Sequence, residues 1–444
     1  MSQKRPSDDT ISAIATAPGR GGIGVIRISG PIVSTIAFGI LGKIPEARKA
    51  LLARFIDKKG ETIDQGIALF FCAPNSYTGE DVLELQGHGG PAVLQNVLAR
   101  CLELGARLAR PGEFTQRAYL NEKMDLAQAE SVADLIDAAT TQAAKSAMRS
   151  LQGEFSRHVH DLVAALINLR MLIESTLDFP EEELEFLQAS QAKEKLKSIR
   201  TTLTKLLGEA KQGKLLSEGL QIVLIGRPNV GKSSLINRLA REEVAIVTPM
   251  AGTTRDTVRQ EVQLDGLPIH IIDTAGLRET TDSVEQIGIA RTWKAVEKSD
   301  IALVIIDAVN GLGEDDKTII ARIPKNLPIM HVYNKADLLI KTPKEKGLYI
   351  SAKTGQGIEE LQQQILKMAG WQQTGEDTFI ARERHVQALL VAEECLNKAN
   401  LNWDQLELFA EELTQAQKAL SGITGEFTAD DLLGEIFSRF CIGK

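Results

Sequence analysis

The sequence predicts a multidomain protein: an N-terminal α/β unit, an all-helical domain, and a second α/β unit with a parallel sheet inserted into that helical domain. Two observations lead to this prediction. The chain has 444 residues, which is too many for one hydrophobic core. Short apolar runs alternate with loops in two separate stretches, and Ala-rich segments with helical spacing lie on both sides of the second stretch.

The first 120 residues predict the mixed α/β unit. Apolar runs bounded by turn residues predict strands at 10–17, 24–29, 65–71 and 81–87. Helical spacing after Pro91 predicts a helix over 91–105. The segment Gly19–Gly24 fits G-x-G-x-x-G, but a strand pattern follows it instead of a helix. We therefore reject a dinucleotide-binding loop there and expect a tight turn.

From Asp125 onward, the spacing of apolar residues is helical. It predicts long amphipathic helices in the stretches 125–171, 190–215 and 380–435. Between them, continuous apolar runs near 220, 269, 301 and 328 predict strands of a parallel sheet that is covered on both faces. The predicted domains are 1–120, 121–216, 217–372 and 373–444, the second and fourth forming one helical domain. Two separate helical domains are the alternative to an insertion, which succeeds where the host's chain ends are close.

Composition restricts the class of protein. Hydrophobic residues make up 43% and charged residues 25%, which is ordinary for a soluble globular protein. The basic start is followed by no apolar run, and no segment approaches roughly 18 apolar residues, so the sequence predicts a cytoplasmic protein without membrane contact. The net charge of −8 argues against nucleic-acid binding by the whole chain, although one domain or a partner could supply a positive face. The four cysteines form no disulfide or zinc pattern.

A phosphate-binding loop follows the first apolar run of the second α/β unit. Gly226–Ser233 matches G-x-x-x-x-G-K-[ST] between a strand and a helix, which is the context that this motif needs. Backbone N–H groups of the loop face the phosphates, Lys232 reaches the β- and γ-phosphates, and the Ser233 hydroxyl binds Mg²⁺. The nucleotide-binding residues predicted here are Asn229, Val230, Gly231, Lys232, Ser233 and Ser234.

Three further motifs, each after a strand, predict that the nucleotide is GTP. Asp273–Gly276 supplies a carboxylate for the Mg²⁺ shell and an amide for the γ-phosphate. Asp337 can accept hydrogen bonds from N1 and N2 of guanine, which adenine does not offer. A backbone amide in Ser351–Lys353 would meet the guanine O6. The residues predicted from these motifs are Asp273, Thr274, Ala275, Gly276, Asn334, Lys335, Asp337, Ser351, Ala352 and Lys353.

The switch segments suggest an unusual hydrolysis. Thr254 is the candidate that closes on Mg²⁺ when the γ-phosphate is present. Ras-like GTPases place a glutamine after D-x-x-G, but this chain has Leu277, so it is either slow or uses another group such as Glu279. Glu279 could equally be a solvated loop charge. Arg255 and Arg278 are candidate arginine fingers, and Asn229 could instead hold a monovalent cation against the phosphates.

These motifs, together with blocks at both ends of the chain, resemble one family along essentially the whole length. The blocks are ATAPGRGGIGVIRISG (15–30), PNSYTGEDVLELQGHGGP (74–91), RPGEFTQRAYLNEKMDLAQAE (110–130) and the terminal GEFTADDLLGEIFSRFCIGK. The resemblance is to the MnmE or TrmE family of GTPases that modify the wobble uridine of tRNA. It implies a folate-binding N-terminal domain, a discontinuous helical domain and an inserted P-loop GTPase domain.

The resemblance also implies partners and chemistry. It implies a homodimer formed through the N-terminal domains, whose GTPase domains meet in the hydrolytic state. It further implies a heterotetramer with an FAD-dependent partner of the MnmG (GidA) type, which acts on tRNA and adds an aminomethyl or carboxymethylaminomethyl group at C5 of the uridine. The implied cofactors are GTP, Mg²⁺, K⁺ and 5,10-methylenetetrahydrofolate or 5-formyltetrahydrofolate.

Site residues carry over from the family position by position. Glu279 matches its catalytic glutamate. The K⁺ site carries over onto Asn229, Thr248, Met250 and Thr253, the last two through backbone groups. The folate site carries over onto Arg27, Glu84, Lys123 and Lys444. A carboxylate such as Glu84 suits the pterin edge, and Arg27 or Lys123 suits the acidic tail of folate.

Cys441 in the terminal Cys-Ile-Gly-Lys is a candidate nucleophile. Substitution at C5 of uridine benefits from a nucleophile that adds to the ring, and thiolates do this well. A cysteine near a chain end is also commonly inert, and a flavin on the partner could supply the chemistry. The remaining alternative for the whole chain is a regulatory or ribosome-assembly GTPase of the Era or Der type, although no RNA-binding block follows Lys353.

Overall fold

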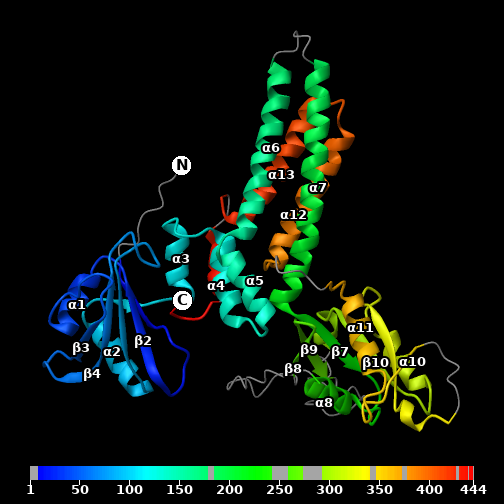
Figure 1. Ribbon diagram of the computed structural model, residues 1–444, viewed down its shortest axis with the longest axis horizontal. Helices are drawn as coiled ribbons and strands as arrows, with labels where there is room; N and C mark the ends of the chain where they lie inside the picture. Colours follow the sequence, from blue (N-terminus) through cyan, green and yellow to red (C-terminus); the bar gives the residue numbers. More distant parts are fainter. Residues whose placement is uncertain are drawn as a thin grey trace. The chain divides into compact units, whose positions relative to one another are not determined.

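The computed structural model describes residues 9–178, 185–242, 259–273, 293–340, 347–372, 378–426, 430–438 and 440–443 (Figure 1). The chain divides into two compact units. One comprises Met1–Ile136, Ser150–Thr201 and Ala388–Lys444, and the other comprises Asp137–Arg149 and Thr202–Gln387. The domain boundaries expected from the sequence stay predictions. In the described residues, no helix is both long and apolar enough to cross a membrane.

The N-terminal part is a six-stranded sheet in the order β3-β4-β5-β2-β1-β6, antiparallel except between β1 and β6. Its elements are β1 (Ile11–Ile14), β2 (Gly21–Ser29), α1 (Val33–Leu41), β3 (Leu51–Ile56), β4 (Thr62–Phe71), β5 (Val82–Gly89), α2 (Pro91–Glu103), β6 (Arg107–Leu108) and α3 (Glu113–Leu120). Strand β2 begins at Gly21, inside Gly19–Gly24, which confirms that this segment is no dinucleotide-binding loop. The sequence prediction missed α1, α3, β3 and β6.

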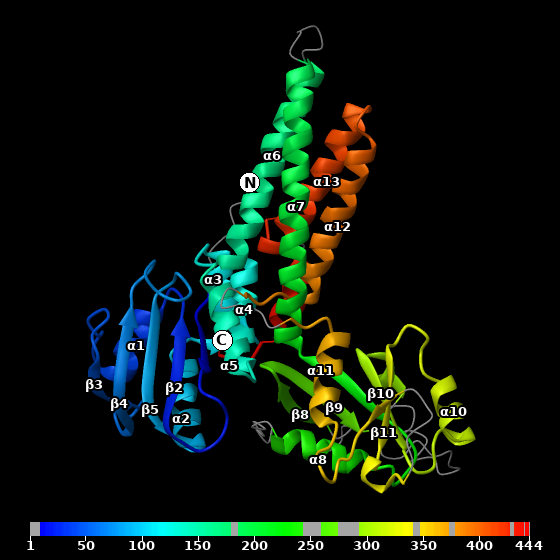
Figure 2. The same cartoon turned by 45° about the vertical axis from the view of Figure 1, so that its right-hand side comes forward.

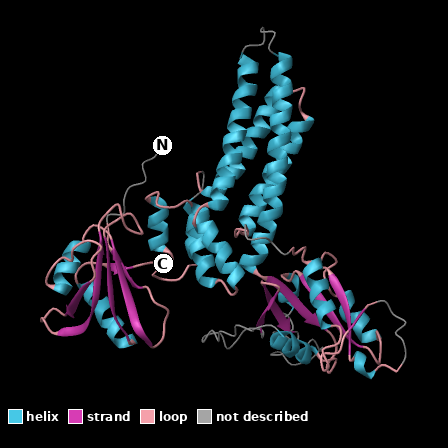
Figure 3. Ribbon diagram, viewed as in Figure 1, coloured by secondary structure: helices cyan, strands magenta, loops and turns pink. Residues whose placement is uncertain are grey.

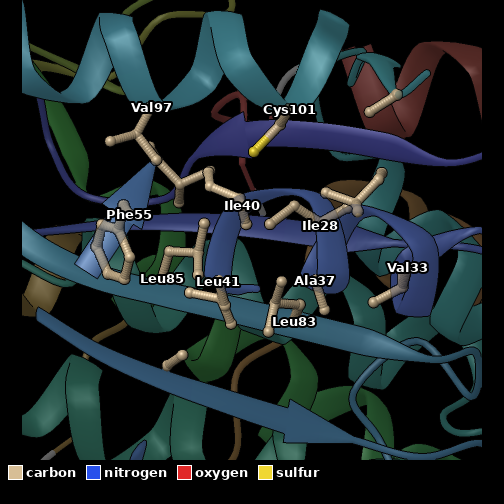
Figure 4. Packing of buried hydrophobic residues seen from close by; sticks show 14 of the residues in the cluster. Ile28, Val33, Ala37, Ile40, Leu41, Phe55, Leu83, Leu85, Val97 and Cys101 are labelled. Carbon is tan, nitrogen blue, oxygen red and sulfur yellow. The ribbon is translucent and has the colours of Figure 1, made fainter. Parts of the chain in front are cut away.

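Helices α1 and α2 cover one face of this sheet and form its hydrophobic core with it (Figure 4). Ile28 of β2 and Leu83 of β5 point into this core together with Val33 of α1 and Cys101 of α2. Because side chains alternate along a strand, the neighbours of these residues in β2 and β5 lie on the opposite face. The sheet therefore offers a second face that α1 and α2 leave uncovered.

A buried cluster of charges fixes the start of α3. The Glu113 side chain is only 3% exposed and accepts hydrogen bonds from both Arg107, over 2.5 and 2.8 Å, and Arg117. Arg117 also pairs with Glu80 at 3.0 Å and with Asp9 at 2.7 Å. Burial alone would raise the pKa of Glu113, but hydrogen bonds from Arg107 and from the Arg110 amide, and the charges of Arg107 and Arg117, lower it to about 2.

We expect this cluster to make the N-terminal part sensitive to acid. Glu113 is ionised in the folded chain down to a pKa of about 2, against 4.5 in the unfolded chain. Its contribution of roughly 3 kcal/mol to the free energy of unfolding is therefore complete above pH 5 and is lost as the pH falls toward 2. Urea denaturation followed by circular dichroism should show less of this acid dependence for Glu113→Gln. Glu103→Gln, which changes an exposed glutamate, should behave like the wild type.

The helices before the second α/β unit are α4 (Leu126–Asp137), α5 (Thr141–Leu151), α6 (Glu154–Asp178) and α7 (Glu185–Glu218), and those after it are α12 (Glu383–Leu401), α13 (Leu406–Thr424) and α14 (Asp430–Ser438). The long helices α6, α7, α12 and α13 run side by side as one bundle (Figures 1 and 2). Helix α6 packs along α13, and Arg170 Nη1 donates to Gln417 Oε1 over 2.7 Å. Helices that precede and follow the inserted unit therefore share one core, which excludes two separate helical domains.

The inserted unit has a six-stranded sheet in the order β12-β11-β10-β7-β9-β8 (Figure 3). All neighbouring strands are parallel except the edge pair β8 and β9. The predicted strands are confirmed, and β8 and β12 are added to them. The elements are β7 (Leu220–Ile225), α8 (Lys232–Glu242), β8 (Arg259–Leu264), β9 (Leu267–Asp273), β10 (Ile301–Asp307), α10 (Glu314–Ala321), β11 (Ile329–Asn334), a 3-10 turn (Ala336–Leu338), β12 (Leu348–Tyr349) and α11 (Ile358–Met368).

The two ends of the inserted unit meet at a junction that we call the neck. Gln212 of α7 donates from Nε2 to the Gly370 carbonyl over 2.8 Å and accepts from the Gln372 amide over 3.1 Å. The Glu383 amide at the start of α12 donates to Glu218 Oε1 over 3.1 Å. The neck thus joins the end of α7 to the chain that returns from the inserted unit.

Candidate functional site

The phosphate-binding loop connects β7 to α8, and two of its glycines are required by close approach. Gly226 lies so near the Ile305 carbonyl of β10 that a Cβ there would overlap it. A Cβ on Gly231 would overlap the Asn334 side-chain amide. The loop therefore lies against the ends of β10 and β11, at the carboxyl edge of the parallel strands. This edge is where open α/β sheets bind ligands.

Lys232 begins α8 and folds back over the loop. Its ammonium donates to the Gly226 carbonyl over 2.7 Å and to the Arg227 carbonyl over 3.2 Å. Burial lowers the pKa of Lys232, and the nearby charge of Asp273 opposes that shift. The adjacent hydroxyls of Ser233 and Ser234 are exposed at the helix N-terminus. The ammonium and the helix start thus supply positive charge at one place, as an anionic phosphate chain requires.

Asp273 ends β9, the parallel neighbour of β7, and pairs in register with Leu224 just before the loop. Its Oδ1 atom is buried and has no hydrogen-bond partner in the described part of the chain. A buried carboxylate oxygen is costly unless it is paired with a donor or a cation. Asp273 therefore fits the Mg²⁺ shell that its motif predicts, with the exposed Ser233 hydroxyl on the opposing helix start.

The two guanine motifs are tied to each other and to the phosphate loop through Asn334. Its Nδ2 donates to the Val230 carbonyl over 2.8 Å, and its Oδ1 accepts from the Ala352 amide over 3.0 Å. Ser351 donates from Oγ to Asp337 Oδ1 over 2.6 Å, which orients that carboxylate. The structure thus brings the three sequence motifs together at one edge of the sheet.

Some of the predicted nucleotide- and ion-binding residues have other contacts, and others lie outside the described residues. The Lys335 ammonium pairs with Asp307 at 2.6 Å, and the Lys353 side chain is exposed. Asn229 is exposed with a φ of 62°, a left-handed conformation that asparagine tolerates better than most residues. Outside the described residues lie Thr248, Met250, Thr253, Thr254, Arg255, Thr274, Ala275, Gly276, Leu277, Arg278, Glu279 and Lys444.

Two arginines that support the site were missed from the sequence. Arg227, inside the phosphate loop, forms a two-pronged pair with buried Asp316 of α10, with distances of 3.0 and 2.8 Å. Arg238 of α8 donates from Nε to the Ala352 carbonyl over 3.1 Å. The position of Arg227 within the loop motif was the only available signal, because its partner lies 89 residues away.

The second face of the N-terminal sheet, on which Phe114 of α3 packs, brings together two of the predicted folate residues. Arg27 of β2 is paired in register with Glu84 of β5, and its Nη2 atom lies 2.9 Å from Glu84 Oε1. The guanidinium also lies over the rings of Tyr77, at 5.4 Å, and Phe114, at 5.8 Å. Burial raises the pKa of Tyr77, whose hydroxyl is 2.7 Å from that of Thr115. Arg27 thus forms an ion pair with Glu84. The family resemblance assigns the two residues to different parts of folate and does not predict this contact.

The other predicted residues of the N-terminal part are more exposed. The Lys123 ammonium donates to the Pro74 carbonyl over 3.0 Å, in the loop that carries Tyr77. Cys441 has an exposed free thiol, and its carbonyl accepts from the Gly112 amide over 3.3 Å, two residues before Phe114. Gly443 lies so close to the Ile14 carbonyl that a Cβ would overlap it. The C-terminal tail therefore lies on the N-terminal sheet region, beside α3.

Comparison with known proteins gives the same family along the whole chain. A family model described as the N-terminus of the GTP-binding protein TrmE matches residues 10–123, and one described as the MnmE helical domain matches residues 126–441. A protein of Nitrosomonas europaea named tRNA modification GTPase MnmE is 59% identical over 99% of this chain and 100% of its own. Proteins of the same name from Dechloromonas aromatica and Neisseria meningitidis serogroup C are 59% and 57% identical, each over 98% of this chain and 99% of their own.

The structural comparison covers a smaller part of the chain. A crystal structure of an Era variant from Aquifex aeolicus bound to GDP and AlF4⁻ covers 39% of this chain and 66% of that chain, with 29% identity and a TM-score of 0.29. The family models and the sheet topology confirm the predicted fold class. Because the family match includes both the N-terminal and the helical part, the ribosome-assembly alternative is not retained.

Proposed function

This chain belongs to the MnmE family of tRNA modification GTPases, and from that premise we propose that it uses GTP turnover to modify C5 of the wobble uridine. It acts as a homodimer in a heterotetramer with an FAD-dependent partner of the MnmG type. The group added is aminomethyl or carboxymethylaminomethyl, with its carbon supplied by 5,10-methylenetetrahydrofolate or 5-formyltetrahydrofolate. One observation carries the GTPase half: Asn334 joins the phosphate loop to the guanine-binding loop, so that Lys232 and Asp337 act on one nucleotide.

The described residues of the site support a definite division of roles. The backbone amides of the loop and the Lys232 ammonium bind the phosphates, whose negative charge grows on the γ-phosphoryl oxygens during transfer. Ser233 and Thr254 would hold Mg²⁺, with Asp273 in its outer shell. When bound, this ion neutralises charge on the β- and γ-phosphates. Asp337, oriented by Ser351, accepts from the guanine N1 and N2 hydrogens.

Glu279 is proposed to orient the attacking water, because Leu277 occupies the position where Ras-like proteins carry glutamine. Asn229 and Thr248, with backbone groups of Met250 and Thr253, would hold K⁺. The exposed left-handed Asn229 in the loop fits a ligand that points out toward the phosphates. When bound, the ion supplies the charge that an arginine finger supplies elsewhere. Closure of two such sites on each other couples hydrolysis to dimerisation of the GTPase domains.

We expect GTP hydrolysis to be at least about tenfold faster in K⁺ than in Na⁺ at equal ionic strength, since one well-placed charge is worth about that much or more. Steady-state phosphate release by the full chain measures this ratio. Asn229→Ala should lower the rate in K⁺ toward the rate in Na⁺. Equal wild-type rates in the two salts would contradict the cation site.

The folate half of the proposal rests on the second face of the N-terminal sheet, opposite α1 and α2. Arg27 and Glu84 place a cation and a carboxylate side by side there, each about one-fifth exposed and flanked by the Tyr77 and Phe114 rings. A pterin needs both a hydrogen-bonding edge and an aromatic surface, and this face provides both. The carboxylate would bind the pterin edge, and Arg27, Lys123 and Lys444 would bind the acidic tail.

Nucleoside analysis of tRNA tests the whole proposal. Cells that lack the protein should lose the wobble modification, and re-expression of the chain should restore it. Unchanged wobble uridines in the deleted strain would overturn the proposed function. Cys441→Ser decides the role of the exposed thiol. Full restoration by this variant would show that the thiol is not the nucleophile, and loss with normal GTP hydrolysis would show that it acts in the uridine chemistry.

A further inference from the structure

The turn between β8 and β9 is hydrogen-bonded to Thr140, the N-cap residue just before α5. Thr140 Oγ1 donates to the Gly266 carbonyl over 3.0 Å and accepts from the Ala143 amide over 3.0 Å. Thr140 is only 4% exposed. Its hydroxyl therefore uses its single donor on the turn and one acceptor position as the N-cap of the helix. Thr140 is therefore a specific polar link between this turn and the start of the helix.

The hydrogen bond from Thr140 depends on the position of the β8–β9 turn, which its backbone conformation sets. Asp265 and Gly266 have φ angles of 49° and 80°, so both central residues of this two-residue hairpin turn are left-handed. A Cβ on Gly266 would be 3.5 Å from Cβ of Gln142 in α5, which is an ordinary contact. A shallow pocket lined by Thr140, Pro268 and His270 lies beside the bond.

The far end of the same hairpin reaches the nucleotide site. Strand β9 runs from Leu267 to Asp273, roughly 20 Å at 3.3 Å per residue. It is in register with β7, whose end is the phosphate loop, and with β8 on its other side. Because β9 is hydrogen-bonded to a neighbouring strand on each edge, it moves as a rigid unit. A shift imposed at Asp273 therefore reaches the Gly266 turn without needing a chain of flexible side chains.

Helix α5 runs from Thr141 to Leu151. It starts in the compact unit that contains the GTPase sheet and ends in the other unit. At its end, Gln128 Nε2 of α4 donates to the Leu151 carbonyl over 3.0 Å. Leu126 of α4 shares a core with Phe437 and Phe440, which lie just before Cys441. The contacts in this second unit thus join the end of α5, through α4, to the residues that precede the tail.

We propose that Thr140 is a positioning residue that couples the nucleotide state at Asp273, through the β8–β9 hairpin, to α5 and the modification chemistry. The proposal rests on the proposed function, because it names the route by which GTP turnover reaches the tRNA-modifying part. It gives Thr140 no contact with nucleotide. Its loss should therefore separate the two activities while leaving GTP hydrolysis intact.

Three substitutions at one position separate the roles of the hydroxyl. Thr140→Ser keeps both the cap and the bond to Gly266. Thr140→Asp keeps the cap, since a carboxylate accepts from the Ala143 amide, but cannot donate to a carbonyl. Thr140→Val removes both. Thr141→Val, at the exposed next residue, is the control for a change of threonine at the helix start.

We measure GTP hydrolysis and wobble-uridine modification with the full chain, its flavin partner and tRNA. Thr140→Ser and Thr141→Val should match the wild type. Thr140→Asp and Thr140→Val should modify tRNA about tenfold more slowly, the size of effect expected for one coupling contact, with kcat for GTP within about twofold. Thermal unfolding identifies a variant that is merely misfolded, and Thr140→Asp keeps the proposal testable if Thr140→Val unfolds.

The outcomes distinguish the two proposals. If wild-type chain modifies no tRNA, the proposed function fails. If it modifies tRNA and Thr140→Asp does so at the same rate, the coupling role is wrong. A second readout is independent of tRNA: hydrogen exchange of the α5 amides should differ between the GDP and GTP-analogue states of the wild type. In Thr140→Asp, exchange of these amides should be the same in both nucleotide states. If this variant instead showed the wild-type difference, the coupling role would also be wrong.

Discussion

Lys232→Ala is expected to lower kcat/KM for GTP by about 10³-fold, because it removes the buried positive charge that meets the phosphates. The ammonium is positioned by two loop carbonyls, at 2.7 and 3.2 Å, and a nucleotide offers it stronger anionic acceptors in the same place. Burial already lowers the pKa of Lys232, so this charge is poorly solvated and its transfer to phosphate oxygens costs little desolvation.

Steady-state phosphate release and nucleotide titration measure this effect. Lys298→Ala, which changes an exposed lysine of the same unit, is the matched control and should leave kcat/KM unchanged. A Lys232→Ala enzyme that keeps a tenth or more of the activity would show that the loop amides and the helix start bind the phosphates without the ammonium.

Asp337→Asn is expected to weaken GTP binding by about 10²- to 10³-fold, because the amide cannot accept from both N1 and N2 of guanine and leaves polar groups unpaired. Xanthine presents a carbonyl where guanine presents the amino group, so the asparagine variant should gain affinity for XTP. Ser351, which now donates to Asp337 over 2.6 Å, can hold the asparagine oxygen in the same orientation.

Competition of GTP and XTP for the site gives the specificity directly. Asp315→Asn, at an exposed aspartate in the first turn of α10, should leave the preference for GTP unchanged. If Asp337→Asn retained full preference for GTP, the guanine base would be recognised by other groups, and the assignment of the Asn334–Asp337 motif would be wrong.

The strands that the sequence predicts are those with an unambiguous pattern. Strand β10 (IALVIID) is buried throughout, and β7 (LQIVLI) and β11 (IMHVYN) are mostly buried, so all three stand out as mainly apolar runs. β8, with the sequence RQEVQL, is an edge strand rich in polar residues, and its register depends on β9. β6 has only two residues, so no periodicity could reveal it. β6 pairs with the distant β1, which a local pattern does not contain, whereas Asp265-Gly266 was a local hairpin signal for β8 that the sequence prediction did not use.

The nucleotide site could be predicted because each of its motifs is local and follows a strand. The contacts that hold those motifs together could not be predicted. Arg227 reaches Asp316 across 89 residues, and Thr140 reaches Gly266 across 126. On the N-terminal sheet, the pairing of Arg27 with Glu84 depends on the register of β2 with β5, which composition and spacing leave undetermined.

The neck has a consequence for how such a protein can be assembled from parts. Because the Glu383 amide lies 3.1 Å from the Glu218 carboxylate, the two chain ends of the GTPase segment are neighbours. A bridge of about five flexible residues would therefore suffice to rejoin α7 to α12 with the segment excised. Conversely, the segment needs only two adjacent attachment points in any host. The GTPase segment can therefore be transferred as a unit. A single insertion between two neighbouring helices is enough to place a GTP-hydrolysing domain inside an existing helical protein.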